Sequence, residues 1–156
     1  MLAEATATTI GQTIKPRSFS ALMDLYEHNY LRMRKIAPDL DIADRMVSVS
    51  AGHLDLYLDV EERCKYTTML RMTYRFHDQE QDREILQPDI HIRIYHDAMI
   101  AEADNRLDRH SQRIYSGETL QQKWNLNRFL YKWVGYCLHQ GHCFHPVSNL
   151  KRINQA

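Results

Sequence analysis

The sequence predicts an α+β domain made of an N-terminal helix, an antiparallel β-meander of about 4–5 strands and a C-terminal helix, with both helices on one sheet face. Three observations support this class. Apolar residues recur at helical spacings of three and four after Ser18 and again from Leu120 to Leu138. Between these segments, apolar and polar residues alternate with the period of a half-buried strand. A run of strands flanked by helices favours α+β over alternating α/β.

The 156 residues fit one domain with a sizeable core. Residues 1–17 are rich in Ala and Thr and lack periodicity, so we expect a disordered tail. Residues 18–147 should form the single α+β domain, and residues 148–156 a short basic tail.

The first helix should start at Ser18, a favourable N-cap residue, and stop before Pro38. Its apolar face is formed by Phe19, Leu22, Met23, Tyr26, Tyr30 and Met33. Arg34 and Lys35 lie in the last turns, where cations stabilise the negative end of the helix dipole.

Three strands are expected between residues 46 and 77. After a first alternating run, Gly52 permits a tight turn. Residues 53–60 form the second strand, with Leu54, Leu56, Leu58 and Val60 on its apolar face. Residues 65–77 should form the longest, central strand.

The polar run 77–88 is predicted to be a long solvated connection. After it, Ile90, Ile92 and Ile94 alternate with polar residues, and apolar character returns at Met99. We interpret residues 88–102 as one long strand with a bulge or bend near His96 and Asp97.

The C-terminal helix is indicated by an apolar stripe, and Gly141 suits its C-terminal cap. The stripe consists of Leu120, Trp124, Leu126, Leu130, Trp133, Val134, Cys137 and Leu138. Thr119 or Ser116 could cap its start, and Ile114 with Tyr115 suggests a short extended piece before it.

Four segments, taken in chain order, resemble the YqiB-like family of proteobacterial proteins: FSALMDLYEHNYLRM, KYTTML, RIYHDAMIAE and NRFLYKWVGYCLHQGH. The similarity covers roughly residues 18–146. The family is classed as a domain of unknown function. The resemblance therefore implies a soluble bacterial protein and brings no activity, cofactor or catalytic residue.

Composition restricts the partners and the location. Twenty basic and twenty acidic residues give a formal net charge of zero, so the basic excess typical of nucleic-acid binding is absent. No stretch approaches eighteen consecutive apolar residues, so we expect no membrane span. Three cysteines without C-x-x-C spacing, and an N-terminus that does not resemble a signal peptide, predict reduced thiols in the cytoplasm. The oligomeric state stays open.

The polar face of the sheet carries the candidate ligand-binding residues. They are Arg71, Arg75, Arg93, Tyr95, Asp97 and Glu102, with Asp55, Tyr57 and Asp59 on the same predicted surface. One interpretation is a solvated face with cross-strand charge pairs, each contributing about 0.2–1 kcal/mol. The other is a pocket in which guanidinium groups bind phosphate or carboxylate with two hydrogen bonds and tyrosines stack or donate hydrogen bonds.

A second candidate is the C-terminal cluster of His139, His142, Cys143 and His145 with Cys137. Thiolates and imidazoles bind zinc, but this spacing matches no standard zinc ribbon or finger. The alternative places Cys137 in the core and His139 at a helix end. We therefore predict no metal and no cofactor, and keep these residues only as weak candidates.

Function is predicted mainly from missing motifs. The sequence has no nucleophile elbow, P-loop, zinc-protease or dinucleotide fingerprint. We therefore expect a cytoplasmic module that binds an unknown protein or a small anionic ligand without catalysis. The alternative is an enzyme for a phosphorylated or nucleotide-like substrate, with Asp97 or Glu102 as general base.

Asp97 also carries a structural prediction. It is either exposed and dispensable or buried and paired, and the expected bend, which should turn it toward neighbouring backbone or an arginine, favours the second case. On that basis, Asp97→Ala should lower the unfolding free energy by more than about 2 kcal/mol.

Overall fold

The structure is a computed structural model that describes residues 18–104 and 120–145. Its elements in chain order are α2 (Phe19–Ile36), β1 (Arg45–Ser48), β2 (Leu56–Arg63), β3 (Thr67–Asp78), β4 (Arg83–Tyr95), β5 (Ile100–Asp104) and α3 (Leu120–His139). The five strands form one antiparallel sheet in the order β1-β2-β3-β4-β5. The predicted α+β class is confirmed.

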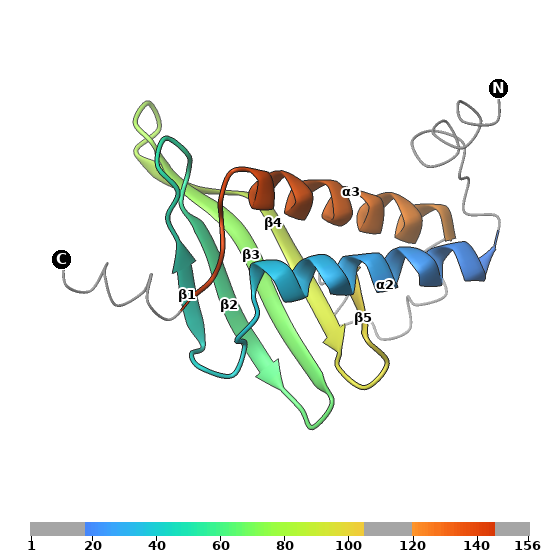
Figure 1. The fold of residues 1–156 in the computed structure, drawn as a ribbon. Coiled ribbons are helices and arrows are strands. Elements are labelled where there is room, and N and C mark those ends of the chain that lie inside the picture. The colour runs from blue at the N-terminus through green and yellow to red at the C-terminus, as the bar shows by residue number, and fades with distance from the viewer. Residues whose placement is uncertain (1–17, 105–119, 146–156) are drawn as a thin grey trace.

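Both helices cover the same face of the sheet and run side by side in the same direction (Figure 1). One core joins α2, all five strands and α3, and the other face of the sheet is not covered by either helix. The fully buried side chains at the centre of the core include Leu56, Leu58, Leu70, Met72, Ile92 and Leu130. These lie at the alternating strand positions and on the helix stripe where the sequence predicted an apolar face.

The helix ends follow local sequence chemistry. Ser18 is the N-cap of α2, and its hydroxyl accepts a hydrogen bond from the Ala21 N–H at 3.2 Å. After α3, Gly141 has a φ of 90°, and His142 N–H donates to Cys137 O while Gly141 N–H donates to Leu138 O. This is the Schellman arrangement that a glycine permits. The predicted N-cap at Ser18 and the predicted C-terminal cap at Gly141 are both confirmed.

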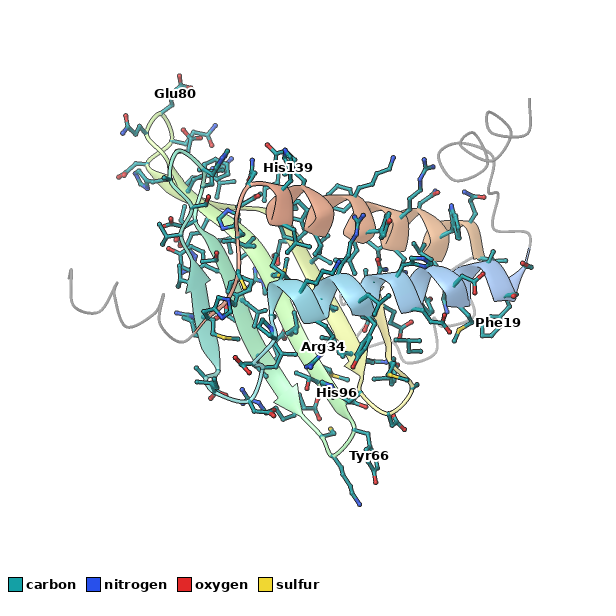
Figure 2. All side chains as sticks on the ribbon, viewed as in Figure 1. Phe19, Arg34, Tyr66, Glu80, His96 and His139 are labelled. Carbon is teal, nitrogen blue, oxygen red and sulfur yellow. The ribbon has the colours of Figure 1, made fainter. Side chains whose placement is uncertain are left out.

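The predicted long loop at residues 77–88 is wrong. β3 continues to Asp78 and β4 begins at Arg83, so only a short turn separates them. Asp78 accepts a hydrogen bond from Glu80 N–H at 3.0 Å, and Asp82 takes a φ of 47°. Figure 2 shows Glu80 at the tip of this hairpin, which extends beyond the helices. Its residues 77–84 are polar, so apolar periodicity gave no indication of strands there.

The predicted single strand at residues 88–102 is also wrong. The chain reverses between Tyr95 and Ile100, where Met99 takes a φ of 53°, and β5 then returns beside β4. His96 anchors the reversal, with its Nε2 2.7 Å from Thr68 Oγ1 and its N–H donating to Tyr66 O. The left-handed position of this turn is occupied by a methionine and not by Gly or Asn, so the sequence carries no turn signal there.

Smaller corrections concern strand lengths and the ends of the apolar runs. β3 is central, but its 12 residues are one fewer than the 13 of β4. Leu54 is exposed and lies before β2, and Tyr66 is exposed in the turn before β3.

Four expectations fall outside the described residues: the tails at 1–17 and 148–156, the extended piece at Ile114 and Tyr115, and the cap at Thr119 or Ser116. Within residues 18–104 and 120–145, no helix has both the length and the apolar character needed to span a bilayer.

Candidate functional site

The sheet face opposite the helices, called the outer face below, is built from cross-strand rows. One row crosses all five strands, because the register sets Arg45 opposite Asp59, Asp59 opposite Arg71, Arg71 opposite His91 and His91 opposite Asp104. Residues directly opposite on one face of a sheet have Cβ atoms about 5 Å apart. The alternation seen in the sequence thus becomes a continuous polar surface.

Ion pairs connect the strand arginines of the outer face to neighbouring carboxylates. The pairs are Arg45–Asp59 at 2.6 Å, Arg71–Asp89 at 2.5 Å, Arg75–Glu84 at 3.2 Å, Arg93–Asp104 at 3.3 Å and Arg93–Glu102 at 3.9 Å. His91 Nδ1 also lies 2.7 Å from Glu61 Oε1. Each guanidinium is therefore held by at least one carboxylate of the same chain.

Arg93 lies at the centre of the most connected group. Its guanidinium donates to Asp104 and to the hydroxyl of Tyr95, and that hydroxyl donates to Glu102 at 2.9 Å. Burial raises the pKa of Tyr95, and the adjacent Glu102 carboxylate acts in the same direction. The phenol consequently stays protonated as a hydrogen-bond donor at neutral pH.

Arg75 occupies the other end of the outer face. Its guanidinium carbon lies 4.7 Å from the centre of the Tyr57 ring, within the range of a cation–π contact. Its Nε is 3.2 Å from Glu84, without the alignment of a hydrogen bond. Packing on a ring and pairing with a carboxylate both fix the side chain.

The structure brings five of the six predicted candidates onto this surface: Arg71, Arg75, Arg93, Tyr95 and Glu102. The sixth, Asp97, is exposed in the turn after β4, so the expectation that it is buried and paired is wrong. The reason is the reversal of the chain, which carries Asp97 beyond the end of the strand rather than along it.

Most of the carboxylates that hold the arginines were not predicted from the sequence. They are Glu84, Asp89 and Asp104, and Glu61, which pairs with His91, was not predicted either. Glu84 lay in the supposed loop, and Asp104 lay beyond the supposed single strand. One sequence pattern could have revealed Asp89. Asp89 and His91 alternate with the buried Ile90 and Ile92, so both should point to the outer face beside Arg71.

A second polar group lies inside the core, at the C-terminal end of α3. Tyr74 Oη is 3.1 Å from Cys137 Sγ and donates to Gln140 Oε1 at 3.2 Å. Ser48 Oγ shares a 2.9 Å hydrogen bond with His142 Nδ1. Cys137 lies in the core, as its place on the helix stripe indicated, but strand periodicity could not reveal that Tyr74 contacts it.

The chemistry of this buried group does not suit nucleophilic catalysis. Burial raises the pKa of Cys137 to about 11 and also raises the pKa of Tyr74. Burial, with the nearby His53, lowers the pKa of His142. At neutral pH the three groups are a thiol, a phenol and a neutral imidazole, which makes this a hydrogen-bonded part of the core.

The four weak metal candidates lie in different environments. His139 and His145 are exposed, His142 is buried against Ser48, and Cys143 donates to Lys35 O at 3.6 Å. In the part of the chain that the structure describes, no three His, Cys, Asp or Glu side chains are grouped as metal ligands.

Comparisons with known proteins add a family. A model described as "Protein of unknown function (DUF1249)" matches residues 32–143. The chain is 30% identical over 139 residues to "Uncharacterized protein YqiB" of Escherichia coli K12, which covers 83% of this chain and 94% of that protein. The YqiB proteins of strains O6:H1 and O157:H7 align with the same identity and coverage. No solved structure matches the chain. These matches agree with the resemblance seen in the sequence.

Proposed function

This chain belongs to the family described as Protein of unknown function (DUF1249), and on that premise we propose that it is a protein-interaction module that binds a partner through its outer face and has no catalysis of its own. The observation that supports this most directly is the organisation of the outer face. Its charged groups are spread over all five strands and are already paired with one another.

The size of the outer face favours a macromolecule over a metabolite. Five strands about 4.8 Å apart span about 19 Å, and the six residue steps from Asp89 to Tyr95 extend about 20 Å along β4. Tyr57 and Met69 lie among the charged rows. A broad surface that mixes charged groups with aromatic and apolar side chains resembles a protein interface more than a site for one small anion.

The pairing of the arginines favours the same conclusion. A phosphate site needs guanidinium groups that converge on one point. Here Arg45, Arg71 and Arg93 turn toward carboxylates on three different strands, β2, β4 and β5. A small anion would meet guanidinium groups that are spread apart and whose charge a neighbouring carboxylate already offsets. The enzyme with a phosphorylated or nucleotide-like substrate stays a prediction that this geometry does not favour.

The proposal includes a cytoplasmic location. Cys64, Cys137 and Cys143 are free thiols, which supports a reducing compartment, where thiols persist.

Site-specific photo-crosslinking in living cells tests the proposed function. A photoreactive phenylalanine analogue replaces Met69, which lies on the outer face opposite Arg93, in one strain. In the matched strain it replaces Leu31, which is exposed on α2 and thus on the covered side of the sheet. We expect a discrete crosslinked species from position 69 that position 31 does not yield.

Two results would count against the proposal. Identical products from both positions would show that the outer face has no special role. Turnover of a phosphorylated metabolite that Arg93→Met abolishes, with the fold intact by circular dichroism, would favour the enzyme instead.

A further inference from the structure

The ion pairs of the outer face do not balance. They join four arginines to five carboxylates and His91 to a sixth, so the paired groups carry a formal charge of −2 when His91 is neutral and −1 when it is protonated. The carboxylates are Asp59, Glu61, Glu84, Asp89, Glu102 and Asp104. The whole chain has a formal charge of zero, so these paired groups are more acidic than the chain as a whole.

Asp59 and Glu102 also have hydrogen-bond acceptor sites beyond those that the arginine and tyrosine donors use. An ionised carboxylate has about four lone-pair sites. Asp59 accepts from Arg45 through Oδ1, and Glu102 accepts from Tyr95 through Oε1. A cationic partner can add bonds to such oxygens and leave the existing pairs in place. An anionic partner would instead meet guanidinium groups whose charge a neighbouring carboxylate already offsets.

These carboxylates are also within reach of a partner. The side chains of Asp59, Glu102 and Asp104 are 20%, 22% and 23% exposed, so each is held in place by its neighbours but still contacts solvent. Preordered charges of this kind lose little side-chain freedom when a partner binds.

From this charge excess, the spare acceptor capacity and the partial exposure, we infer that the partner bound by the outer face presents a cationic segment rich in Lys or Arg. This inference rests on the proposed function and specifies the chemistry of the partner. Complementary charge across an interface sets specificity and accelerates encounter, and its influence weakens as salt screens it.

Substitutions in the Arg45–Asp59 pair can separate the effect of the net charge of the outer face from the effect of breaking an ion pair. Arg45→Gln and Asp59→Asn both break this ion pair, but they change the charge of the outer face in opposite directions. The probe is a fluorescein-labelled peptide of alternating lysine and glycine, followed by fluorescence anisotropy at low ionic strength. We expect Arg45→Gln to tighten binding about threefold and Asp59→Asn to weaken it about threefold, as one unit charge some 7 Å away does in water.

The control variant is Glu27→Gln, an exposed carboxylate on α2, which should leave the affinity within about 1.5-fold of the parent because α2 covers the other face. A matched peptide of alternating glutamate and glycine should bind more weakly than the lysine peptide to every variant. Equal shifts in Arg45→Gln and Asp59→Asn would overturn the inference, since the effect would follow the broken pair and not the charge.

The two proposals can fail separately. Position-dependent crosslinking at residue 69 together with a preference for the glutamate peptide would overturn the cationic partner and leave the proposed function standing. Loss of the position dependence would overturn the proposed function, whichever peptide binds.

Discussion

At the scale of single residues, the contact between Arg32 and α3 explains why a glycine occupies the middle of that helix. The Arg32 guanidinium carbon lies 3.4 Å from the centre of the Tyr131 ring, and the group donates to the Tyr131 carbonyl. A Cβ on Gly135 would collide with the same guanidinium. Glycine in a helix interior costs roughly 0.5–1 kcal/mol relative to alanine. The contact that glycine permits offsets this cost.

Gly135→Ala should therefore lower the unfolding free energy by about 1–2 kcal/mol, because a charged hydrogen bond and a cation–π contact are lost together. In an Arg32→Ala background the same substitution should instead raise it by about 0.5–1 kcal/mol, since only helix propensity remains. Urea unfolding of the four proteins measures both signs. A Gly135→Ala effect of the same sign in both backgrounds would show that Arg32 is not what requires the glycine.

Asp97 lies at the other extreme, exposed in a turn. We expect Asp97→Ala to change the unfolding free energy by less than about 0.5 kcal/mol, the usual range for a surface substitution away from structural contacts. This replaces the loss of more than about 2 kcal/mol that followed from an assumed buried pair. Equilibrium unfolding in urea decides between the two values.

At the scale of elements, the side chain of Asn127 satisfies backbone groups of the edge strand β5. Asn127 Oδ1 accepts from Ala103 N–H at 2.6 Å, and its Nδ2 donates to Lys123 O at 2.8 Å and to Ala103 O at 3.5 Å. An edge strand presents unpaired backbone groups that invite pairing with another chain. Here a side-chain amide from α3 satisfies both backbone groups of Ala103.

Replacing this amide should destabilise the domain measurably. Asn127→Ala leaves the buried Ala103 N–H without its partner, so the unfolding free energy should fall by about 1–3 kcal/mol. Hydrogen exchange at the Ala103 amide should accelerate in the same variant. Asn125→Ala is the control, because Asn125 is exposed on the same helix and pairs only with Gln121 among the described residues. Equal losses in the two variants would show that the edge contact is unimportant.

At the scale of the whole molecule, the segment after α3 links the end of that helix to β1 and α2. His142 bonds to Ser48 of β1, and Phe144 N–H donates to Ile36 O at 2.7 Å. Both His142 and Phe144 are buried. Because this buried junction contains an imidazole, we expect the stability of the whole domain to depend on pH.

The direction of that dependence follows from the lowered pKa of His142, which burial causes and His53 reinforces, while Asp55 opposes it. In the unfolded chain the imidazole has an ordinary pKa of about 6.5. Below that pH the unfolded state takes up a proton that the folded state resists. The contribution of His142 is therefore fully present above about pH 6.5 and is lost as the pH falls through the folded pKa.

We expect the unfolding free energy to fall between about pH 7 and pH 5, and His142→Asn to reduce that fall. Asparagine can keep a hydrogen bond to Ser48 but does not titrate. His145→Asn serves as control because His145 is exposed close by in the chain. An unchanged pH profile in His142→Asn would assign the dependence to other groups.

Prediction from sequence succeeded where a residue's neighbours along the chain decide its environment. The N-cap at Ser18, the cap at Gly141 and the outward parity of Arg71 and Arg93 are of this kind. Both hairpin turns of β4 were missed because the positive φ angles fall on Asp82 and Met99, neither of which is a glycine.

The sequence by itself determined the α+β class, the apolar faces of both helices and the alternation that makes one sheet face polar. These properties follow from the helical and strand periods, which act over a few residues. Only the tertiary structure decided that Asp104 meets Arg93, that Asn127 caps β5 and that Arg32 lies over Tyr131, 99 residues away in the chain. Such contacts depend on strand register and on the close approach of distant elements, and one residue of slip in a strand exchanges its two faces.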